Sequence, residues 1–176
     1  MEIYLIADMH FGHKNIINMS KRPFTSIMEN DLTIMKNWNK TVTNLDKVFV
    51  LGDVSFYGKG QTKQIVRSLN GEKILLLGNH DTSKSNKWWM DVGFKDVIER
   101  PFILNTKREF KINMEKLFVL SHMPITNVCI GDLLNVHGHI HDKEIGETLN
   151  KHFNVSVENI DYTPISIKEI LKMELM

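Results

Sequence analysis

The stretch KILLLGNHD, residues 73–81, joins a short apolar run to a cluster of polar side chains. An apolar run of this length that ends at a glycine predicts a buried strand followed by a loop. Two earlier stretches have the same form, EIYLIAD at 2–8 and KVFVLGD at 47–53. The sequence therefore predicts three buried strands, each of which ends at polar residues.

Segments with helical spacing of apolar residues separate these three strands. NDLTIMKNWNKTV (30–42) and QTKQIVRSL (61–69) both place apolar residues at intervals of three and four, which is typical of one buried helical face. The resulting order is strand, helix, strand, helix, strand. This order favours a sheet whose strands are buried between helices.

The second half of the chain has a different character. RPFILN (100–105), REFKINM (108–114) and KLFVLSH (116–122) predict consecutive strands, more typical of a meander than of crossovers. LLNVHGHIHD (133–142) predicts a short strand that runs into a loop, and HFNVSVENI (152–160) predicts a last strand. These segments predict a second sheet.

A closing helix is predicted for SIKEILKMEL (166–175), where Ser166 and Glu169 have the spacing of a capping box. The expected fold class is α/β. The expected architecture is a four-layer sandwich, in which two mixed β-sheets pack face to face and are flanked by helices. We expect a single domain over residues 1–176.

Composition and charge exclude several classes of protein. The chain has 42% hydrophobic residues and a net charge of +1, so we expect no stable nucleic-acid complex, although a nucleic acid could still be a small substrate. The one cysteine, Cys129, excludes an internal disulfide and a zinc site built of thiolates. The stretch MEIYLIADMH lacks the basic start and cleavage site of a signal peptide, and no apolar run is long enough for a membrane span. We therefore expect a soluble cytoplasmic protein without a membrane partner.

Oxygen and imidazole ligands follow the apolar runs. The candidates are Asp8, His10, Asp53, Asn79, His122, His139 and His141. Open α/β sheets bind ligands beyond the carboxyl ends of their strands, so residues far apart in sequence can converge there. Each residue taken alone is more often a turn, a cap or a buried histidine. Five clusters at the ends of five apolar runs favour a common site.

The spacing within the clusters supports a shared site. Asp8 and His10 are two residues apart, as are His139 and His141, so in extended backbone each pair points to the same side. Glycines at positions 52, 78 and 138 directly precede three candidates. A glycine at such a position permits a sharp turn or a close approach of the backbone to a ligand.

The ligand types indicate a class of metal. Imidazole and carboxylate without thiolate suit Mn, Fe, Zn or Co better than Ca or Mg. Seven candidates are too many for one tetrahedral ion and fit two ions that share a bridging carboxylate. Two such ions, about 3.5–4 Å apart, are the usual apparatus for displacement at phosphorus.

As a set, these motifs resemble the calcineurin-like metallophosphoesterase superfamily. The resemblance rests on D-x-H at 8–10, G-D at 52–53, G-N-H-D at 78–81, a histidine after a strand at 122 and G-H-x-H at 138–141. The surroundings are similar to a compact bacterial and phage branch. The branch motifs are GHKNII at 12–17, R-P-F at 22–24, W-N at 38–39, N-x-H-G-H-x-H at 135–141 and N-V-x-V-E at 154–158.

The resemblance implies a role for each candidate. Asp8, His10 and His141 would hold a first ion, and Asn79, His122 and His139 would hold a second. Asp53 would bridge the two ions. The expected cofactors are two divalent metal ions, Mn²⁺ first, with Fe, Zn, Ni or Co as alternatives. A hydroxide between the ions would attack phosphorus in line with the leaving group.

Residues outside the ligand set receive further expected roles. His80 would protonate the leaving oxygen or stabilise the charge of the crowded phosphorus, and Asp81 would orient His80 or cap a helix. His13 and Arg22 are candidates for binding the substrate phosphate. His137 would pack or orient a ligand. Ser121 departs from the family's pattern, since many members have glycine before the isolated histidine.

The expected activity is hydrolysis of phosphomonoester or phosphodiester bonds, with a phosphorylated small molecule or nucleotide as substrate. One alternative is a nuclease or cyclic-nucleotide phosphodiesterase of the same superfamily. Another is a metal-binding scaffold that has kept the fold and lost the chemistry. The oligomeric state stays open at this stage.

Overall fold

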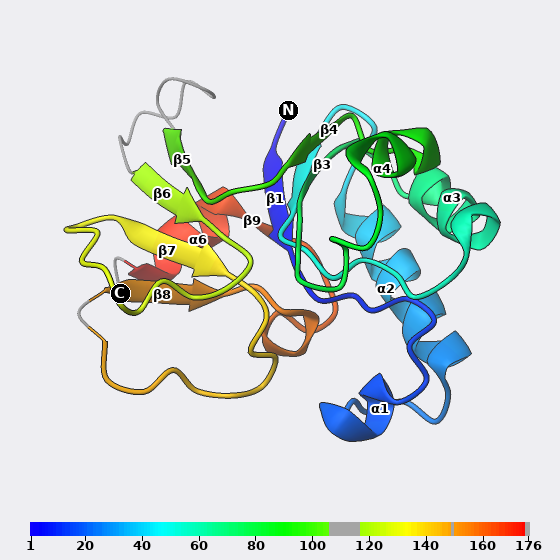
Figure 1. The fold of residues 1–176 in the computed structure, drawn as a ribbon, viewed down its shortest axis with the longest axis horizontal. Coiled ribbons are helices and arrows are strands. Elements are labelled where there is room, and N and C mark those ends of the chain that lie inside the picture. Colours follow the sequence, from blue (N-terminus) through cyan, green and yellow to red (C-terminus); the bar gives the residue numbers. More distant parts are fainter. Residues whose placement is uncertain (106–116, 149, 175–176) are drawn as a thin grey trace.

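Two β-sheets form the centre of the computed structural model, which describes residues 1–105, 117–148 and 150–174 (Figure 1). The first sheet has the strand order β4-β3-β2-β1-β9, and the second has the order β5-β6-β7-β8. The predicted α/β architecture of two mixed sheets flanked by helices is confirmed.

The first sheet contains the three strands predicted from the apolar runs. β1 (Ile3–Ile6), β2 (Lys47–Val50), β3 (Glu72–Leu76) and β4 (Asp96–Ile98) are parallel to one another. A short β9 (Ile165–Ser166) pairs antiparallel with β1. The carboxyl ends of β1, β2 and β3 therefore lie along one edge of the sheet.

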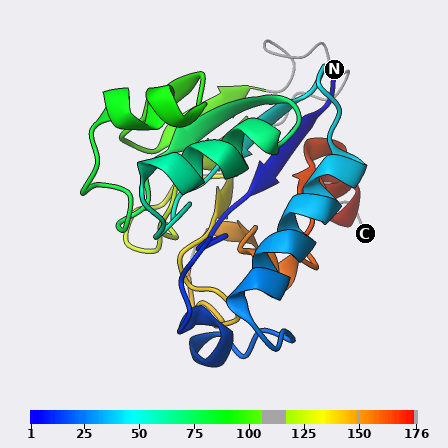
Figure 2. The ribbon, with the colours of Figure 1, turned by 90° about the vertical axis from the view of Figure 1, so that its right-hand side faces the viewer.

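Helices cover the outer face of this sheet (Figure 2). α2 (Ile27–Thr41), α3 (Lys59–Ser68) and α4 (Asn86–Val92) pack their buried side chains against one face of the strands, with Trp38 and Trp89 at the centre of the cluster. A short α1 (Ile16–Met19) follows the first polar loop. Within the described ranges, no helix is both long and apolar enough to cross a bilayer.

The second sheet differs from the predicted meander. β5 (Phe102–Asn105) and β6 (Leu117–Leu120) are antiparallel, but β7 (Leu134–His137) runs parallel to β6, and β8 (Lys151–Asn154) runs parallel to β7. The connections on either side of β7 reach the dozen or so residues that a parallel crossover needs. The strand predicted at 108–114 lies outside the described residues.

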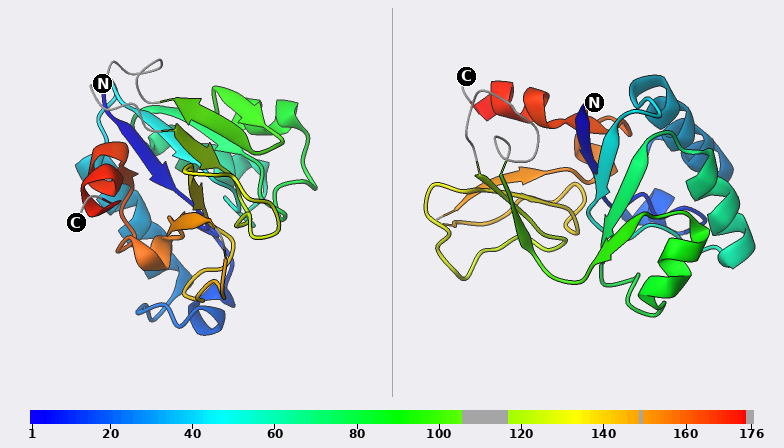
Figure 3. Two further views of the ribbon diagram at one scale, coloured as in Figure 1. Left: turned by 90° about the vertical axis from the view of Figure 1, so that its left-hand side faces the viewer. Right: turned by 90° about the horizontal axis from the view of Figure 1, so that it is seen from above.

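The two sheets pack face to face, as predicted (Figure 3). Apolar side chains from both sheets form one buried cluster, which includes Leu5, Phe118 and Val136. α6 (Ile167–Glu174) packs into this same cluster through Ile170 and so closes the core between the sheets.

The capping box predicted before α6 is confirmed. The backbone N–H of Ser166 donates to Glu169 Oε2 at 2.9 Å, and the backbone N–H of Glu169 donates to Ser166 Oγ at 3.2 Å. These reciprocal bonds satisfy two donors that the first helical turn would otherwise leave free.

The last predicted strand is shorter than expected. β8 ends at residue 154, and a 3₁₀ turn occupies Val157–Asn159. Between them the backbone N–H of Ala7 donates to the carbonyl of Val155 at 2.9 Å, and Val157 N–H donates to the carbonyl of Ala7 at 3.1 Å. This stretch therefore connects the second sheet to the end of β1.

Candidate metal centre

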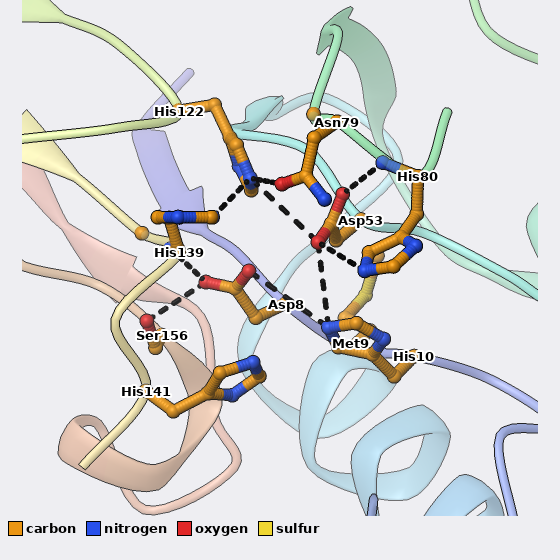
Figure 4. A network of polar contacts seen from close by, with 12 residues as sticks. Asp8, Met9, His10, Asp53, Asn79, His80, His122, His139, His141 and Ser156 are labelled. Atoms are coloured by element: carbon orange, nitrogen blue, oxygen red, sulfur yellow. Dashed lines mark hydrogen bonds and ion pairs between the residues drawn. The ribbon is translucent and has the colours of Figure 1, made fainter. Parts of the chain in front are cut away.

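Loops from both sheets meet at their carboxyl edges (Figure 4). The loops after β1, β2 and β3 come from the first sheet, and the loops after β6 and β7 come from the second. They bring the seven predicted ligands together: Asp8, His10, Asp53, Asn79, His122, His139 and His141. The convergence predicted from the strand ends therefore occurs in the structure.

Asp8, His10 and His141 form the first ligand group, in which one potential ligand atom from each residue lies within 4.8 Å of the others. Asp8 Oδ1 and both ring nitrogens of His10 are buried without a hydrogen-bond partner among the described residues. Burying such atoms unpaired is unfavourable, and a cation bound to Asp8 Oδ1 and to one ring nitrogen of His10 would satisfy two of the three. These oxygen and nitrogen donors therefore fit a divalent metal.

Asp53, His122 and His139 form the second ligand group, in which one potential ligand atom from each residue again lies within 4.8 Å of the others. His139 Nδ1 lies 3.2 Å from His122 Nε2, and Asn79 Oδ1 lies 2.9 Å from that same nitrogen. Ring nitrogens that converge with an amide oxygen and a carboxylate are suited to a transition metal.

Asp53 lies between the two groups. Its Oδ2 is 3.5 Å from His10 Nε2 in the first group and 3.6 Å from His122 Nε2 in the second. One carboxylate oxygen therefore faces both positions. This arrangement fits the bridging role that the resemblance implies.

Hydrogen bonds fix the orientation of two imidazole rings. His122 Nδ1 lies 2.7 Å from the carbonyl oxygen of Leu51, and His141 Nδ1 lies 3.0 Å from Glu158 Oε1. An Nδ1–H that donates to an oxygen leaves Nε2 unprotonated on the side of the ligand group, where it can bind a metal. Sequence reasoning missed the role of Glu158, although this residue closes one of the quoted branch motifs.

Asp8 is oriented in a similar way. Its Oδ2 accepts hydrogen bonds from Ser156 Oγ and from the backbone N–H of His139, both at 2.7 Å. The other oxygen, Oδ1, has no described partner. Ser156 was not predicted, because nothing in the sequence links it to Asp8.

The backbone of the ligand loops is unusual. Five of the predicted ligands have positive φ angles: Asp8 at 57°, His10 at 50°, Asp53 at 55°, His139 at 72° and His141 at 55°. Residues with a Cβ rarely adopt this conformation, and such residues concentrate at functional sites. The loops are therefore shaped to present these side chains.

The glycines before three of the ligands permit close approach of neighbouring loops, as predicted. A Cβ at Gly138 would collide with the carboxylate of Asp8, and a Cβ at Gly78 would collide with that of Asp53. Gly52 has a φ of 94° and lies against the backbone of Gly78. Neighbouring loops can therefore touch only because these positions lack a side chain.

Burial disfavours the charged forms of the ligands, which keeps His10 and His139 neutral for metal binding but also favours the protonated form of Asp8. It raises the pKa of Asp8 to about 6, and with its cationic neighbours it lowers the pKa of His10 to about 2. Burial also lowers the pKa of His139. His141 differs: burial alone would lower its pKa, but the hydrogen bond to Glu158 raises it overall. A cation would stabilise the buried carboxylate, and neutral imidazoles are ready to bind it.

His80 lies at the entrance of the centre. Its side chain is 49% exposed, and its Nε2 is 3.9 Å from Asp53 Oδ2. Asp81 does not contact the His80 ring in any described hydrogen bond; its carboxylate accepts from the backbone N–H groups of Gly78, Asp53 and Val54 at 2.7–3.1 Å. These bonds tie two ligand loops together, and a role of Asp81 in orienting His80 stays a prediction.

Arg22 is buried, and its five N–H donors all have acceptors within the protein. They bind Glu158, the carbonyl oxygens of Asp8 and Met9, and the side chain of Asn30 at 2.7–3.0 Å. The structure therefore argues against the predicted contact between Arg22 and substrate. The burial of this guanidinium could not be read from a lone arginine in the sequence.

Two further histidines lie beside the ligands. The ring of His13 stacks on Phe56 with centroids 4.2 Å apart and lies 5.5 Å from the His10 ring, at the edge of the centre. His137 is fully buried against His152 and belongs to neither ligand group. These placements are compatible with the substrate role predicted for His13 and the packing role predicted for His137.

The fold and the site define a two-sheet α/β protein with two adjacent groups of metal ligands that share a carboxylate. The calcineurin-like phosphoesterase family matches residues 1–172, and the chain belongs to this family.

Two proteins similar to this chain have names that give no substrate. An uncharacterized protein of Methanocaldococcus jannaschii is 34% identical over 181 residues, covering 98% of this chain and 90% of the relative. The Gene 66 protein of Mycobacterium phage L5 is 34% identical over 84 residues, covering 44% of this chain and 39% of the relative. These relatives fit the compact branch predicted from the motifs.

One solved structure resembles the whole chain. It is a protein of unknown function from Aquifex aeolicus, with a TM-score of 0.75 and 28% identity over 98% of both chains. The two-sheet fold therefore recurs in this relative over its full length.

Proposed function

We propose that this protein hydrolyses phosphate esters with two divalent cations held by the two ligand groups. Mn²⁺ is the first metal to test, and Fe, Zn, Ni and Co are the alternatives. The observation that carries the proposal is the position of Asp53 Oδ2, which is within 3.6 Å of a ring nitrogen from each group. Bound cations would supply a nucleophilic oxygen at neutral pH and would neutralise the charge of the phosphate.

The ligand set limits the negative charge that an anionic substrate meets. Only Asp8 and Asp53 contribute carboxylates, and the remaining ligands are imidazoles and the amide of Asn79. Two dications would leave the centre positive overall. This balance favours binding of a phosphate ester.

His80 is the proposed general acid. Its exposed ring lies near Asp53, and its own backbone N–H donates to Asp53 Oδ1 at 3.0 Å, which positions the backbone of His80. A histidine titrates close to neutral pH and can protonate an alkoxide that would otherwise leave poorly. Its ring lies outside both ligand groups, which supports a role in proton transfer.

The alternatives are less well supported. A net charge of +1 provides little attraction for long nucleic acid, which weakens the case for a nuclease. A scaffold without activity would not need the seven ligands and His80 together. The proposed substrate is therefore a phosphorylated small molecule or a nucleotide.

The direct test is an assay of metal-loaded protein with p-nitrophenyl phosphate and bis-p-nitrophenyl phosphate. We expect turnover with Mn²⁺ and its loss on addition of EDTA. A protein that holds both metals but cleaves neither substrate with any of the candidate ions would favour the scaffold.

A further inference from the structure

A large cavity opens beside the second ligand group. Its volume is about 910 Å³, and Asn79 and His122 form part of its wall. No residue of the first ligand group lines it. Small-molecule sites commonly have volumes of this size, and a phosphate group would fill only a small part. The cavity therefore has room for an organic part of the substrate.

The wall of this cavity is mainly apolar. Leu77, Pro101, Met123 and Ile125 contribute to it from the ends of strands in both sheets. The wall also has polar side chains, which include one lysine, Lys84, and one carboxylate, Glu99. Apolar surface with polar groups around it suits a ring carried by the substrate, and a carboxylate in the same wall disfavours a second phosphate.

His80 lies on a different side of the centre. It is not part of the cavity wall, and its ring lies 5.6 Å from the ring of His10 and 5.1 Å from that of Phe56. In Figure 4, His80 and His122 approach Asp53 from different directions. If His80 protonates the leaving oxygen, the group in the cavity is the one that remains on phosphorus.

We propose that this protein is a phosphodiesterase whose preferred substrates retain a ring-bearing substituent, which binds in the cavity between Leu77, Pro101 and Met123. The inference rests on the proposed function. Water adds to phosphorus, the bond from phosphorus to the leaving alcohol breaks, and the alcohol oxygen takes its proton from His80. The proton that water loses restores His80. The product is a monoester that keeps the ring.

Three substrates with the same leaving group test this inference. They are p-nitrophenyl phosphate, methyl p-nitrophenyl phosphate and thymidine 5′-(p-nitrophenyl phosphate). We expect kcat/KM for the thymidine diester to exceed that for the methyl diester by at least about tenfold, because only thymidine fills the cavity. Calorimetry of the metal-loaded protein should also show tighter binding of thymidine 5′-monophosphate than of methyl phosphate.

Met123→Asp places a charge in the apolar wall and should remove this preference in both measurements. Met123→Ser is a milder second variant in case the aspartate disturbs folding. Met90→Asp is a matched control, since Met90 is 51% exposed against 50% for Met123 and does not line the cavity. It should keep the wild-type preference.

The possible results separate the two proposals. Equal rates for both diesters, a preference that survives both Met123 variants, or fastest cleavage of the monoester would overturn the inference while the proposed function stands. No cleavage of any of the three substrates by protein with full metal content would overturn the proposed function itself.

Discussion

Glu158 shares one carboxylate oxygen between His141 and Arg22. Its Oε1 lies 3.0 Å from His141 Nδ1, and 2.9 and 2.8 Å from the Nε and Nη2 atoms of Arg22. Arg22 also binds the carbonyl oxygen of Asp8. The buried ion pair of Glu158 and Arg22 therefore holds two ligands of the first group, His141 through its ring and Asp8 through its carbonyl oxygen.

Glu158→Gln should weaken metal binding, because the neutral amide no longer fixes the charge and tautomer of His141. Removal of such a supporting group typically costs about 10–100-fold in metal affinity. Titration calorimetry with Mn²⁺ measures this, with the exposed Glu144→Gln as control. Equal affinity in the two variants would show that Glu158 has no such role.

His80→Asn should separate chemistry from metal binding. We expect kcat to fall by about 10²–10⁴-fold while metal content stays at two ions per chain. His10→Asn should instead lower the metal content, because this residue belongs to the first ligand group. The checks are elemental analysis and steady-state kinetics with a diester of an alkyl alcohol, because p-nitrophenolate leaves without help from an acid. Loss of metal from the His80 variant would refute its proposed role.

At the level of single residues, the sequence predicted the site where a potential ligand also stood at the end of a predicted strand. Asp53 and His139 follow glycines at strand ends, so their convergence could be predicted. Ser156 lies 148 residues from its partner Asp8, and no spacing rule links them. Arg22 is a candidate for substrate binding in the sequence because it follows the first ligand motif, whereas its observed partners are set by tertiary folding.

Among the structural elements, the second sheet was the hardest to predict. β5, β6 and β7 are short apolar runs that look alike in sequence, so their direction could not be read from composition. A connection of a dozen or more residues permits parallel pairing without excluding antiparallel pairing, so its length does not decide the direction of β7. β9 has two residues, pairs with β1 and directly precedes α6, and a strand this short leaves no pattern in the sequence.

The loops after β1 and β7 provide a test at this scale. Gly138→Ala would drive a methyl group into the Asp8 carboxylate, whereas a Cβ at Gly146 meets open space. We expect Gly138→Ala to cost about 1–3 kcal/mol in the free energy of unfolding and to lower metal affinity. Gly146→Ala should change neither quantity in urea unfolding and Mn²⁺ titration. Equal behaviour of the two variants would mean that the loops do not meet as described.

The turn between α2 and β2 should contribute to stability in a pH-dependent way. Asp46 accepts hydrogen bonds from the backbone N–H and hydroxyl of Thr43 and from the backbone N–H of Glu2. Burial alone would raise its pKa, but these bonds lower it overall. The contribution is therefore present above the unfolded pKa of about 3.9 and is lost as the pH falls through the lower folded value.

Asp46→Asn should lower the free energy of unfolding at about pH 7 and reduce its difference between about pH 7 and pH 3. Urea unfolding in EDTA measures this without a contribution from metal. The exposed Asp132→Asn is the control. An unchanged pH dependence in the Asp46 variant would contradict the assignment.

At the scale of the whole molecule, each ligand group draws on both sheets. Asp8 and His10 come from the first sheet and His141 from the second, while Asp53 and His122 join the sheets in the other group. The packing of the two sheets therefore sets the distances within the centre. Metal binding should in turn stabilise the whole fold, since it joins both layers.

The most direct test is anomalous diffraction from crystals of the Mn²⁺-loaded protein. We predict two peaks about 3.5–4 Å apart, one beside His10 and one beside His122, with Asp53 in contact with both. A single peak, or peaks away from these two groups, would contradict the account.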